Sequence, residues 1–210
     1  MNLGLNPMEL RALCGGIDIY LLDQILRGRI PSGRRIFEAG CGTGRNLVYF
    51  LRAGFEVAAV DQDPAAIAEV RRLARTLAPA VDQANFRAEP IEEMSFAAGC
   101  FEVVISSAVF HFARDPNHFQ AILDASWRVL RPGGLFFCRL ASTIGMPDRF
   151  IPIGEGRFQL PDGSRRFLVD EARLLELTQR MGGELIDPLK TTVVQDQRSM
   201  TTWVLRKLER

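Results

Sequence analysis

The chain has 210 residues, of which 47% are hydrophobic and 24% are charged. This length suffices for one α/β domain with a sizeable core and is too short for two such domains. The formal net charge of +1 gives no excess of one sign that would indicate a nucleic-acid or membrane-surface partner. We therefore expect a single domain over residues 1–210, with no nucleic acid and no membrane as a partner.

The cysteine and N-terminal patterns set further bounds. The cysteines are scattered, with no C-x-x-C and no Cys/His pair at metal-ligand spacing: Cys14, Cys41, Cys100 and Cys138. This usage is typical of reduced thiols, although four cysteines can also pair, and it predicts no metal site. The first ten residues lack the basic start and apolar core of a secretion signal. We expect a cytoplasmic protein, and the sequence leaves both a monomer and a homodimer open.

Residues 34–61 predict a strand, a glycine loop, a helix and a second strand that ends on a carboxylate. Glu38 leads into the loop, where Gly40, Gly42 and Gly44 alternate with other residues. Glycines this close together remove Cβ atoms that would keep a ligand off the backbone, and they permit positive φ. Asp61 follows the loop by about 20 residues, a position from which a carboxylate can accept hydrogen bonds from ribose hydroxyls.

The spacing of this loop separates two classes of ligand. Residues 38–44 read E-x-G-x-G-x-G, whereas the dinucleotide fingerprint is G-x-G-x-x-G. A carboxylate just before the first glycine adds negative charge beside a pyrophosphate, so it is unfavourable there. It suits a cationic ligand. A nucleotide-binding fold of another kind remains the alternative.

Residues Glu38 to Gly44 resemble the glycine motif of the class I S-adenosylmethionine-dependent methyltransferases. The resemblance implies S-adenosylmethionine as the cofactor and a small molecule as the methyl acceptor. It places Glu38 near the charged amino acid part of the cofactor and Asp61 on the ribose. The cofactor-binding residues that it implies are Glu38, Gly40, Cys41, Gly42, Gly44, Asn46, Asp61, Gln62, Glu89, Pro90 and Ser106.

Residues 1–33 are expected to form a helical arm before this unit. The apolar spacing predicts a helix over Ile17–Leu26, followed by a turn into the first strand. A helix here can lie across the cofactor crevice, where Tyr20 is a candidate substrate contact. The same apolar face can equally well just cover the edge of the sheet.

The pattern continues with a helix and a third strand. Asp63 is a good N-cap for a helix over Pro64–Leu77, and Asn85–Glu89 predicts a short strand. In the methyltransferase family this strand often ends in a Gly-Asp pair whose carboxylate reaches the adenine amino group. Here Glu89 stands in the place of that aspartate after an alanine, so either this role or that of a solvated loop residue remains open.

The fourth strand is predicted over Phe101–Ser107 and continues into a segment that resembles the S-x-A-x-H-H run of small-molecule methyltransferases. His111 matches the second histidine of that run. Residues at the end of this strand are expected to border the methyl group. His111 is the candidate catalytic residue, as a general base or an orienting group, and a packed structural histidine is the alternative. We expect His118 at the surface.

The last third of the chain completes the pattern. A helix over 116–129, a turn at 130–134 and a strand over 135–140 precede an irregular insertion at 141–168 with a hairpin around 161–163. The insertion is expected to cover the substrate. Its arginines, among them the candidate substrate contact Arg149, suit an anionic substrate or are simply solvated. A helix over Glu171–Gln179 and two strands near 184–194 and 201–207 follow.

These elements predict a doubly wound, mostly parallel seven-stranded sheet of the Rossmann-like methyltransferase type, with an antiparallel last strand. The implied reaction is in-line transfer of a methyl group. One alternative is a dehydrogenase-like domain that binds NAD; a Tyr-x-x-x-Lys pair is absent, because Tyr20 and Tyr49 are followed four residues later by Gln24 and Ala53. The other alternative is a non-catalytic protein that keeps the cofactor site.

Overall fold

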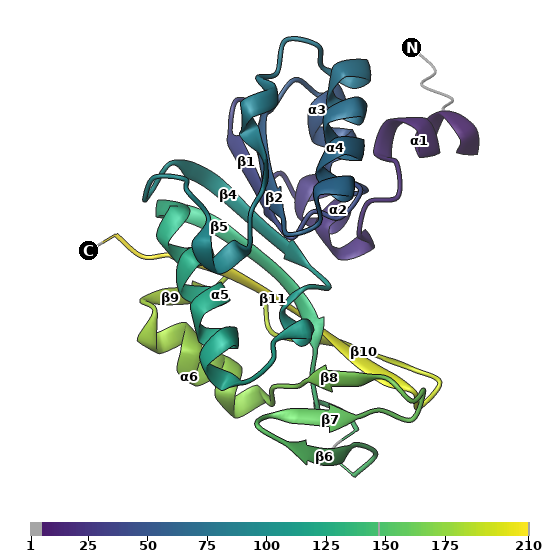
Figure 1. Cartoon of the computed structure of the whole chain (residues 1–210), viewed down its shortest axis with the longest axis vertical. Coiled ribbons are helices and arrows are strands. Elements are labelled where there is room, and N and C mark those ends of the chain that lie inside the picture. The colour runs from purple at the N-terminus through teal and green to yellow at the C-terminus, as the bar shows by residue number, and fades with distance from the viewer. Residues whose placement is uncertain (1–5, 147, 210) are drawn as a thin grey trace.

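The computed structural model describes residues 6–146 and 148–209. A twisted sheet runs through the molecule with helices on both faces, and a small second sheet lies at one end (Figure 1). Within the described residues, none of the helices is long and apolar enough to cross a membrane.

The large sheet confirms the predicted fold class. Its strand order is β10-β11-β5-β4-β1-β2-β3, and β9 also pairs with β11. Pairing is parallel from β3 to β5 and antiparallel between β5 and β11. The strands are β1 (Arg35–Ala39), β2 (Glu56–Asp61), β3 (Phe86–Ala88), β4 (Phe101–Ser107), β5 (Leu130–Ala141), β9 (Gly183–Leu185), β10 (Lys190–Val194) and β11 (Arg198–Lys207).

The edge of the sheet differs from the expectation of one strand near 184–194. Two short strands, β9 and β10, share that edge and pair with opposite ends of β11. The segment between them leaves the ladder, and there Asp187 binds the guanidinium of Arg29. This contact with the N-terminal arm interrupts what the sequence pattern presents as one strand.

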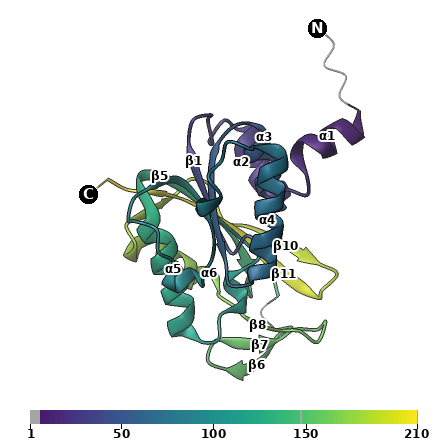
Figure 2. The same ribbon diagram turned by 45° about the horizontal axis from the view of Figure 1, so that its top comes forward.

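The helices form two layers (Figure 2). One face of the sheet is covered by three helices: α2 (Ile19–Leu26), α3 (Leu47–Arg52) and α4 (Pro64–Leu77). The other face is covered by α5 (Pro116–Val129) and α6 (Glu171–Arg180). Alternate residues of β1, β2 and β4 point to the two faces and pack against these two layers. Four of these helices begin at a capping aspartate that accepts a backbone hydrogen bond: Asp18, Asp63, Asp115 and Asp170. Short 3-10 turns are η1 (Gln83–Asn85), η2 (Ile91–Glu93) and η3 (Phe110–Phe112).

The N-terminal arm holds one helix that the sequence analysis did not predict. Helix α1 (Pro7–Cys14) begins with a capping box between Asn6 and Glu9. It ends at Gly15, where φ is +63° and an added Cβ would lie 2.8 Å from Val48 of α3. The arm therefore lies close against α3. Residues 1–5 of the expected arm lie outside the described residues.

The expected turn at 130–134 belongs instead to a long strand. Strand β5 begins directly after α5 at Leu130, and its register on β4 shifts between Phe101 and Val103. The extra residues form an irregularity of the bulge type. Gly134 is required there because an added Cβ would lie 2.8 Å from the carbonyl oxygen of Arg131.

The insertion at 141–168 folds into a three-stranded antiparallel sheet. The predicted hairpin is confirmed as β7 (Arg157–Gln159) and β8 (Arg165–Phe167), and β6 (Ile151–Gly154) adds a strand that the glycine and proline content concealed. A separate apolar cluster that includes Phe150 and Met200 joins this sheet to the end of β11. Residue 147 lies outside the described residues.

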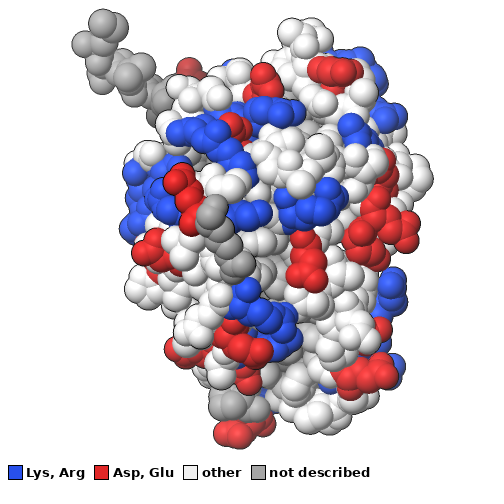
Figure 3. Space-filling view, turned by 90° about the vertical axis from the view of Figure 1, so that its left-hand side faces the viewer, with Lys and Arg blue, Asp and Glu red and all other residues white. Residues whose placement is uncertain are grey.

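Charges on the surface are mixed. On the face shown in Figure 3, basic and acidic side chains are interspersed with uncharged ones. This agrees with the formal net charge of +1.

Candidate functional site

A cavity of about 550 Å³ opens at the carboxyl ends of β1, β2 and β4. The chain winds from β1 to β2 and β3 in one direction, and then crosses to β4 on the other side of β1. Ligands of open α/β sheets bind at such a reversal, because the loops after the two central strands diverge there. The predicted loop therefore lies where the fold makes a crevice.

The three glycines of the loop all have positive φ, but for different reasons. At Gly40 an added Cβ would lie 2.7 Å from Val109, and at Gly44 it would lie 3.1 Å from Val70. At Gly42 no atom lies within 4 Å of that position, and Gly42 lines the cavity. Gly40 and Gly44 thus allow close packing within the protein, whereas Gly42 leaves room for a ligand.

Glu38 is buried at the end of β1 and lines the cavity. Its Oε1 accepts a hydrogen bond of 2.6 Å from the amide of Asn46, and its Oε2 has no hydrogen-bond partner among the described residues. Burial raises the pKa of Glu38 to about 8, although the bond from Asn46 and the charge of Arg45 oppose this. A cation beside this buried carboxyl group would favour its ionised form, so the group is suited to bind a cationic ligand.

Asp61 ends β2 on the opposite wall. Its Oδ2 accepts a hydrogen bond of 2.8 Å from the backbone of Gly42, and its Oδ1 accepts one of 3.0 Å from the backbone of Asp63. Both bonds fix the carboxylate at the mouth of the loop, where Gln62 also lines the cavity. Each carboxylate oxygen can accept a further bond, so the group remains able to hold ligand hydroxyls. Cys41 lines the same wall, and burial raises the pKa of its thiol.

The loop after β3 and the start of α5 form the far end of the cavity. Pro90, Ile91 and Glu92 line it together with His118. Nε2 of His118 lies 2.9 Å from the Glu92 carboxylate. The expectation of a surface position for His118 is wrong, because the turn before α5 folds back onto η2.

Two residues expected at the cofactor are held elsewhere. The Glu89 carboxylate accepts hydrogen bonds from the backbone and the hydroxyl of Ser95, and it is not among the described residues that line the cavity. Ser106 is buried within β4 and its hydroxyl donates to the carbonyl of Ala39. Neighbouring strand residues face opposite sides, so Ser107 lines the cavity in its place. Ser107 is followed by Ala108, which has a φ of +65°.

His111 lies in η3, just beyond the lining residues. It is buried, and its Nδ1 accepts a hydrogen bond of 3.3 Å from the backbone of Ala141. Burial, together with the positive charges of Arg166, Arg139 and Arg198, lowers the pKa of His111 to about 4. The ring is therefore neutral at neutral pH. With Nδ1 as an acceptor, its proton is on Nε2.

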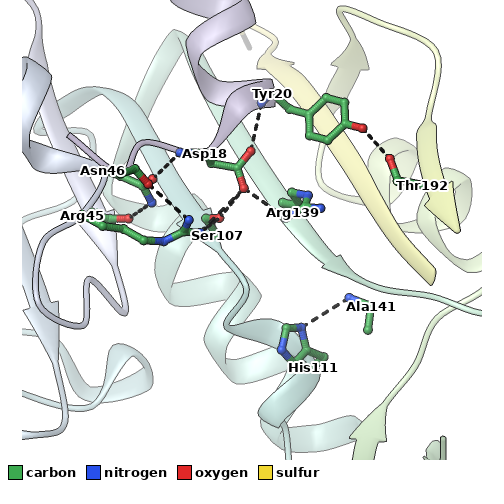
Figure 4. A network of polar contacts seen from close by, with 11 residues as sticks. Asp18, Tyr20, Arg45, Asn46, Ser107, His111, Arg139, Ala141 and Thr192 are labelled. Carbon is green, nitrogen blue, oxygen red and sulfur yellow. Dashed lines mark hydrogen bonds and ion pairs between the residues drawn. The ribbon is translucent and has the colours of Figure 1, made fainter. Parts of the chain in front are cut away.

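A polar network that the sequence analysis missed joins the N-terminal arm to the sheet (Figure 4). The buried carboxylate of Asp18 accepts a hydrogen bond of 3.0 Å from Ser107 and one of 3.2 Å from Arg139, and lies 3.7 Å from Arg45. The Asp18 backbone donates to Asn46 at 2.9 Å. An N-cap aspartate before an apolar helix gives no sequence signal of such distant partners.

The candidate substrate contacts Tyr20 and Arg149 are not among the cavity-lining residues that the structure describes. The Tyr20 hydroxyl bonds to Thr192 of β10, and the guanidinium of Arg139 lies 5.3 Å from the centre of its ring. Arg149 is exposed and lies 3.6 Å from Asp196. Arg166 instead reaches the cavity wall, where it lies 4.8 Å from the centre of the Phe112 ring.

The described residues contain no cluster of three or more histidine, cysteine or acidic side chains that could hold a metal ion. The polar features of the cavity wall are the buried acid Glu38, the acid Asp61 at the end of β2 and the backbone of Gly42.

A family model described as "Methyltransferase domain" matches residues 37–138. Among the similar proteins is an uncharacterized methyltransferase, sll0829, from Synechocystis sp., 30% identical over 107 residues, which are 51% of this chain and 47% of that protein. Another is the ubiquinone/menaquinone biosynthesis C-methyltransferase UbiE of Zymomonas mobilis, 28% identical over 60% of this chain and 51% of that protein.

A crystal structure of an S-adenosylmethionine-dependent methyltransferase from Methanosarcina mazei has the same fold, with a TM-score of 0.70 and 21% identity over 89% of this chain and 98% of that one. Residues 37–138 thus match a methyltransferase domain, and the chain has the fold of an S-adenosylmethionine-dependent methyltransferase. It spans about half the length of the curated methyltransferases that it matches.

The cofactor of this methyltransferase class is S-adenosylmethionine, which carries an ammonium and a sulfonium charge. The residues present fit that group, because Glu38, whose Oε2 has no partner among the described residues, lines the cavity and Gly42 leaves its Cβ position open. A pyrophosphate at the same place would meet the carboxylates of Glu38 and Asp61. The acidic residues of the cavity thus suit a cationic cofactor better than a pyrophosphate.

Proposed function

We propose that this protein transfers the methyl group of S-adenosylmethionine to a small-molecule acceptor. The observation that carries the proposal is the buried Glu38 carboxyl group, whose Oε2 has no partner among the described residues; Glu38 itself lines the cavity. Such an atom is stabilised by a cationic ligand, and the ammonium group of the cofactor meets this need.

The other lining residues support a placement of the cofactor along the cavity. Asp61, fixed by the backbone of Gly42, would bind the ribose hydroxyls. Pro90 and Ile91 would contact the adenine ring, and Glu92, rather than Glu89, is the carboxylate on that wall. The methyl group would then lie toward Ser107 and Ala108, at the end of β4.

When bound, S-adenosylmethionine supplies a methyl group on a positively charged sulfur. An acceptor held in line with the carbon–sulfur bond would receive this methyl group, and the electron pair of that bond would remain on sulfur. The chain contributes position and exclusion of water. Helix α2, anchored by Asp18, and the sheet β6–β8 flank the end of β4, so both can cover the reacting groups.

A small-molecule acceptor is favoured because the methyl group would lie inside the cavity. The relative UbiE is named as a C-methyltransferase of ubiquinone and menaquinone biosynthesis. The free cysteines, Cys14, Cys41, Cys100 and Cys138, support a reducing compartment such as the cytoplasm.

Calorimetric titration tests the proposal with S-adenosylmethionine, S-adenosylhomocysteine and NAD, for the wild type and for Asp61→Ala. We expect both adenosyl ligands to bind, NAD not to bind, and the variant to bind at least about tenfold more weakly, since it loses hydrogen bonds to a charged group. Binding of NAD alone would identify a dehydrogenase-like domain. Binding of none of the three would contradict a cofactor site altogether.

A further inference from the structure

Two buried polar atoms on neighbouring strands have no hydrogen-bond partner among the described residues. They are Nε of Arg139 on β5 and Oγ1 of Thr202 on β11. The two residues are paired in the antiparallel ladder, so their side chains share one face of the sheet, with Cβ atoms about 5 Å apart. Unpaired buried donors are costly in folded proteins, so two side by side would be stabilised by a ligand that pairs with both.

This pair lies beside the expected position of the methyl group. Arg139 is also the strand partner of Ser107, which lines the cofactor cavity. Its Nη1 donates to the buried carboxylate of Asp18 at 3.2 Å, which fixes the guanidinium. Figure 4 shows Arg139 close to the start of α2, beside Asp18 and Tyr20. Nε is buried and donates to no atom among the described residues.

The surroundings of the pair are positive. Arg166, Arg139 and Arg198 all act on His111 and lower its pKa. Asp18 is the acid that contacts Arg139, and its carboxylate already accepts bonds from Ser107 and from the backbone of Tyr20. Within the part of the chain that the structure describes, Arg166 and Arg198 have no ion-pair partner within 4.0 Å. A region with more arginine than carboxylate charge favours an anionic ligand.

We propose that Arg139 and Thr202 bind a carboxylate group of the methyl acceptor. A guanidinium N–H and a hydroxyl side by side offer two donors to the two oxygens of a carboxylate, and the charge of Arg139 compensates its negative charge. The neutral His111 can donate a third bond from Nε2. This inference rests on the proposed methyl transfer and narrows its acceptor to small carboxylic acids.

The inference is tested by binding of simple probes to the full chain with saturating S-adenosylhomocysteine. Benzoate carries the carboxylate, benzamide has nearly the same shape without the charge, and phenyl phosphate carries a different anion. Titration calorimetry or ligand-observed NMR gives the affinities. We expect benzoate to bind at least about tenfold more tightly than benzamide, and phenyl phosphate to bind no more tightly than benzoate.

The variant Thr202→Val distinguishes a ligand-binding role of Thr202 from a purely structural one. The variant removes a buried hydroxyl that has no partner, so the melting temperature without benzoate should rise, while the affinity for benzoate should fall about fivefold or more. Arg139→Gln should weaken benzoate binding more strongly, although it also leaves Asp18 without its ion pair. Arg206→Gln, on the same strand but exposed, is the control that should change neither quantity.

The possible failures can be told apart. If the wild type does not bind S-adenosylhomocysteine, the proposed function is wrong. If it binds S-adenosylhomocysteine but binds benzoate and benzamide equally, or prefers phenyl phosphate, the carboxylate subsite is wrong. A Thr202→Val variant that melts earlier and binds benzoate as the wild type does would also contradict it.

Discussion

Asn46 connects the buried acid Glu38 to the N-terminal arm. Its amide nitrogen donates to Oε1 of Glu38 at 2.6 Å, and its amide oxygen accepts a hydrogen bond of 2.9 Å from the backbone of Asp18. One amide side chain thus orients the acid that would bind the cofactor and anchors the start of α2. The arm and the cofactor site are coupled through this residue.

Asn46→Ala should therefore weaken both stability and cofactor binding. The change leaves Glu38 and the Asp18 backbone without a buried partner, at a cost of about 1–3 kcal/mol in the free energy of unfolding. Urea denaturation measures this cost, and calorimetry with S-adenosylhomocysteine measures the affinity. Asn117→Ala, an exposed position on α5, is the control. Equal effects of the two substitutions would argue against the coupling.

The raised pKa of Glu38 predicts a specific dependence of stability on pH. Between the ordinary value of 4.5 and about 8, the folded protein holds a proton that the unfolded chain releases. The free energy of unfolding should therefore fall as the pH rises through this window, by up to about 1.4 kcal/mol per pH unit from this group. Urea denaturation of wild type and Glu38→Gln at several pH values isolates this contribution, because the glutamine cannot titrate. Parallel profiles would show that Glu38 is ionised throughout.

Two glycine substitutions should have different effects. Gly40→Ala forces a Cβ against Val109 at positive φ and should destabilise the protein by about 1–3 kcal/mol or more. Gly42→Ala meets no protein atom and adds a methyl group to the cavity wall, so its larger effect should be on cofactor affinity. Melting temperature and calorimetry on both variants measure the two effects. Val109→Ala in the Gly40→Ala background should restore part of the stability.

His111 should not control the rate through its protonation near neutral pH. Its pKa of about 4 keeps the ring neutral, and the backbone of Ala141 donates to the nitrogen that would act as a base. With an identified acceptor and saturating cofactor, the wild-type rate should show no limb near the usual histidine pKa of about 6.5. His111→Gln, which keeps an N–H donor, should retain more activity than His111→Ala. A rate that rises through that pH, and only in the wild type, would show that His111 is a base.

The sequence correctly predicted those helices and strands whose bounds are marked by nearby residues, such as a capping aspartate or a short apolar run. The predicted helices from Pro64 toward Leu77 and from about Pro116 to Val129 are confirmed, because an aspartate cap and a proline fix each start. The strand Phe101–Ser107 also matches, as a buried apolar run between polar residues. The sequence also predicted the positions of Gly42 and Asp61 in the cavity wall, because both belong to one local βαβ unit.

The remaining differences come from contacts between distant segments. Tyr20 bonds to Thr192, 172 positions away, and Asp18 bonds to Arg139, 121 positions away, which periodicity cannot show. A shift of one residue decides that Ser107 rather than Ser106 faces the cavity, because neighbouring strand residues face opposite sides. Glu89 has a local partner in Ser95 that competes with the role that the family motif implied.

The most direct test of the central claim compares two adenosyl ligands. S-adenosylhomocysteine carries the amino acid part with its ammonium group, and 5′-methylthioadenosine lacks it. Calorimetry on wild type and Glu38→Gln should show a loss of at least about tenfold for S-adenosylhomocysteine and little change for 5′-methylthioadenosine, because the substitution removes only the charge partner of the ammonium group. Equal losses for both ligands, or none for either, would contradict the assignment of Glu38 as the cation-binding acid.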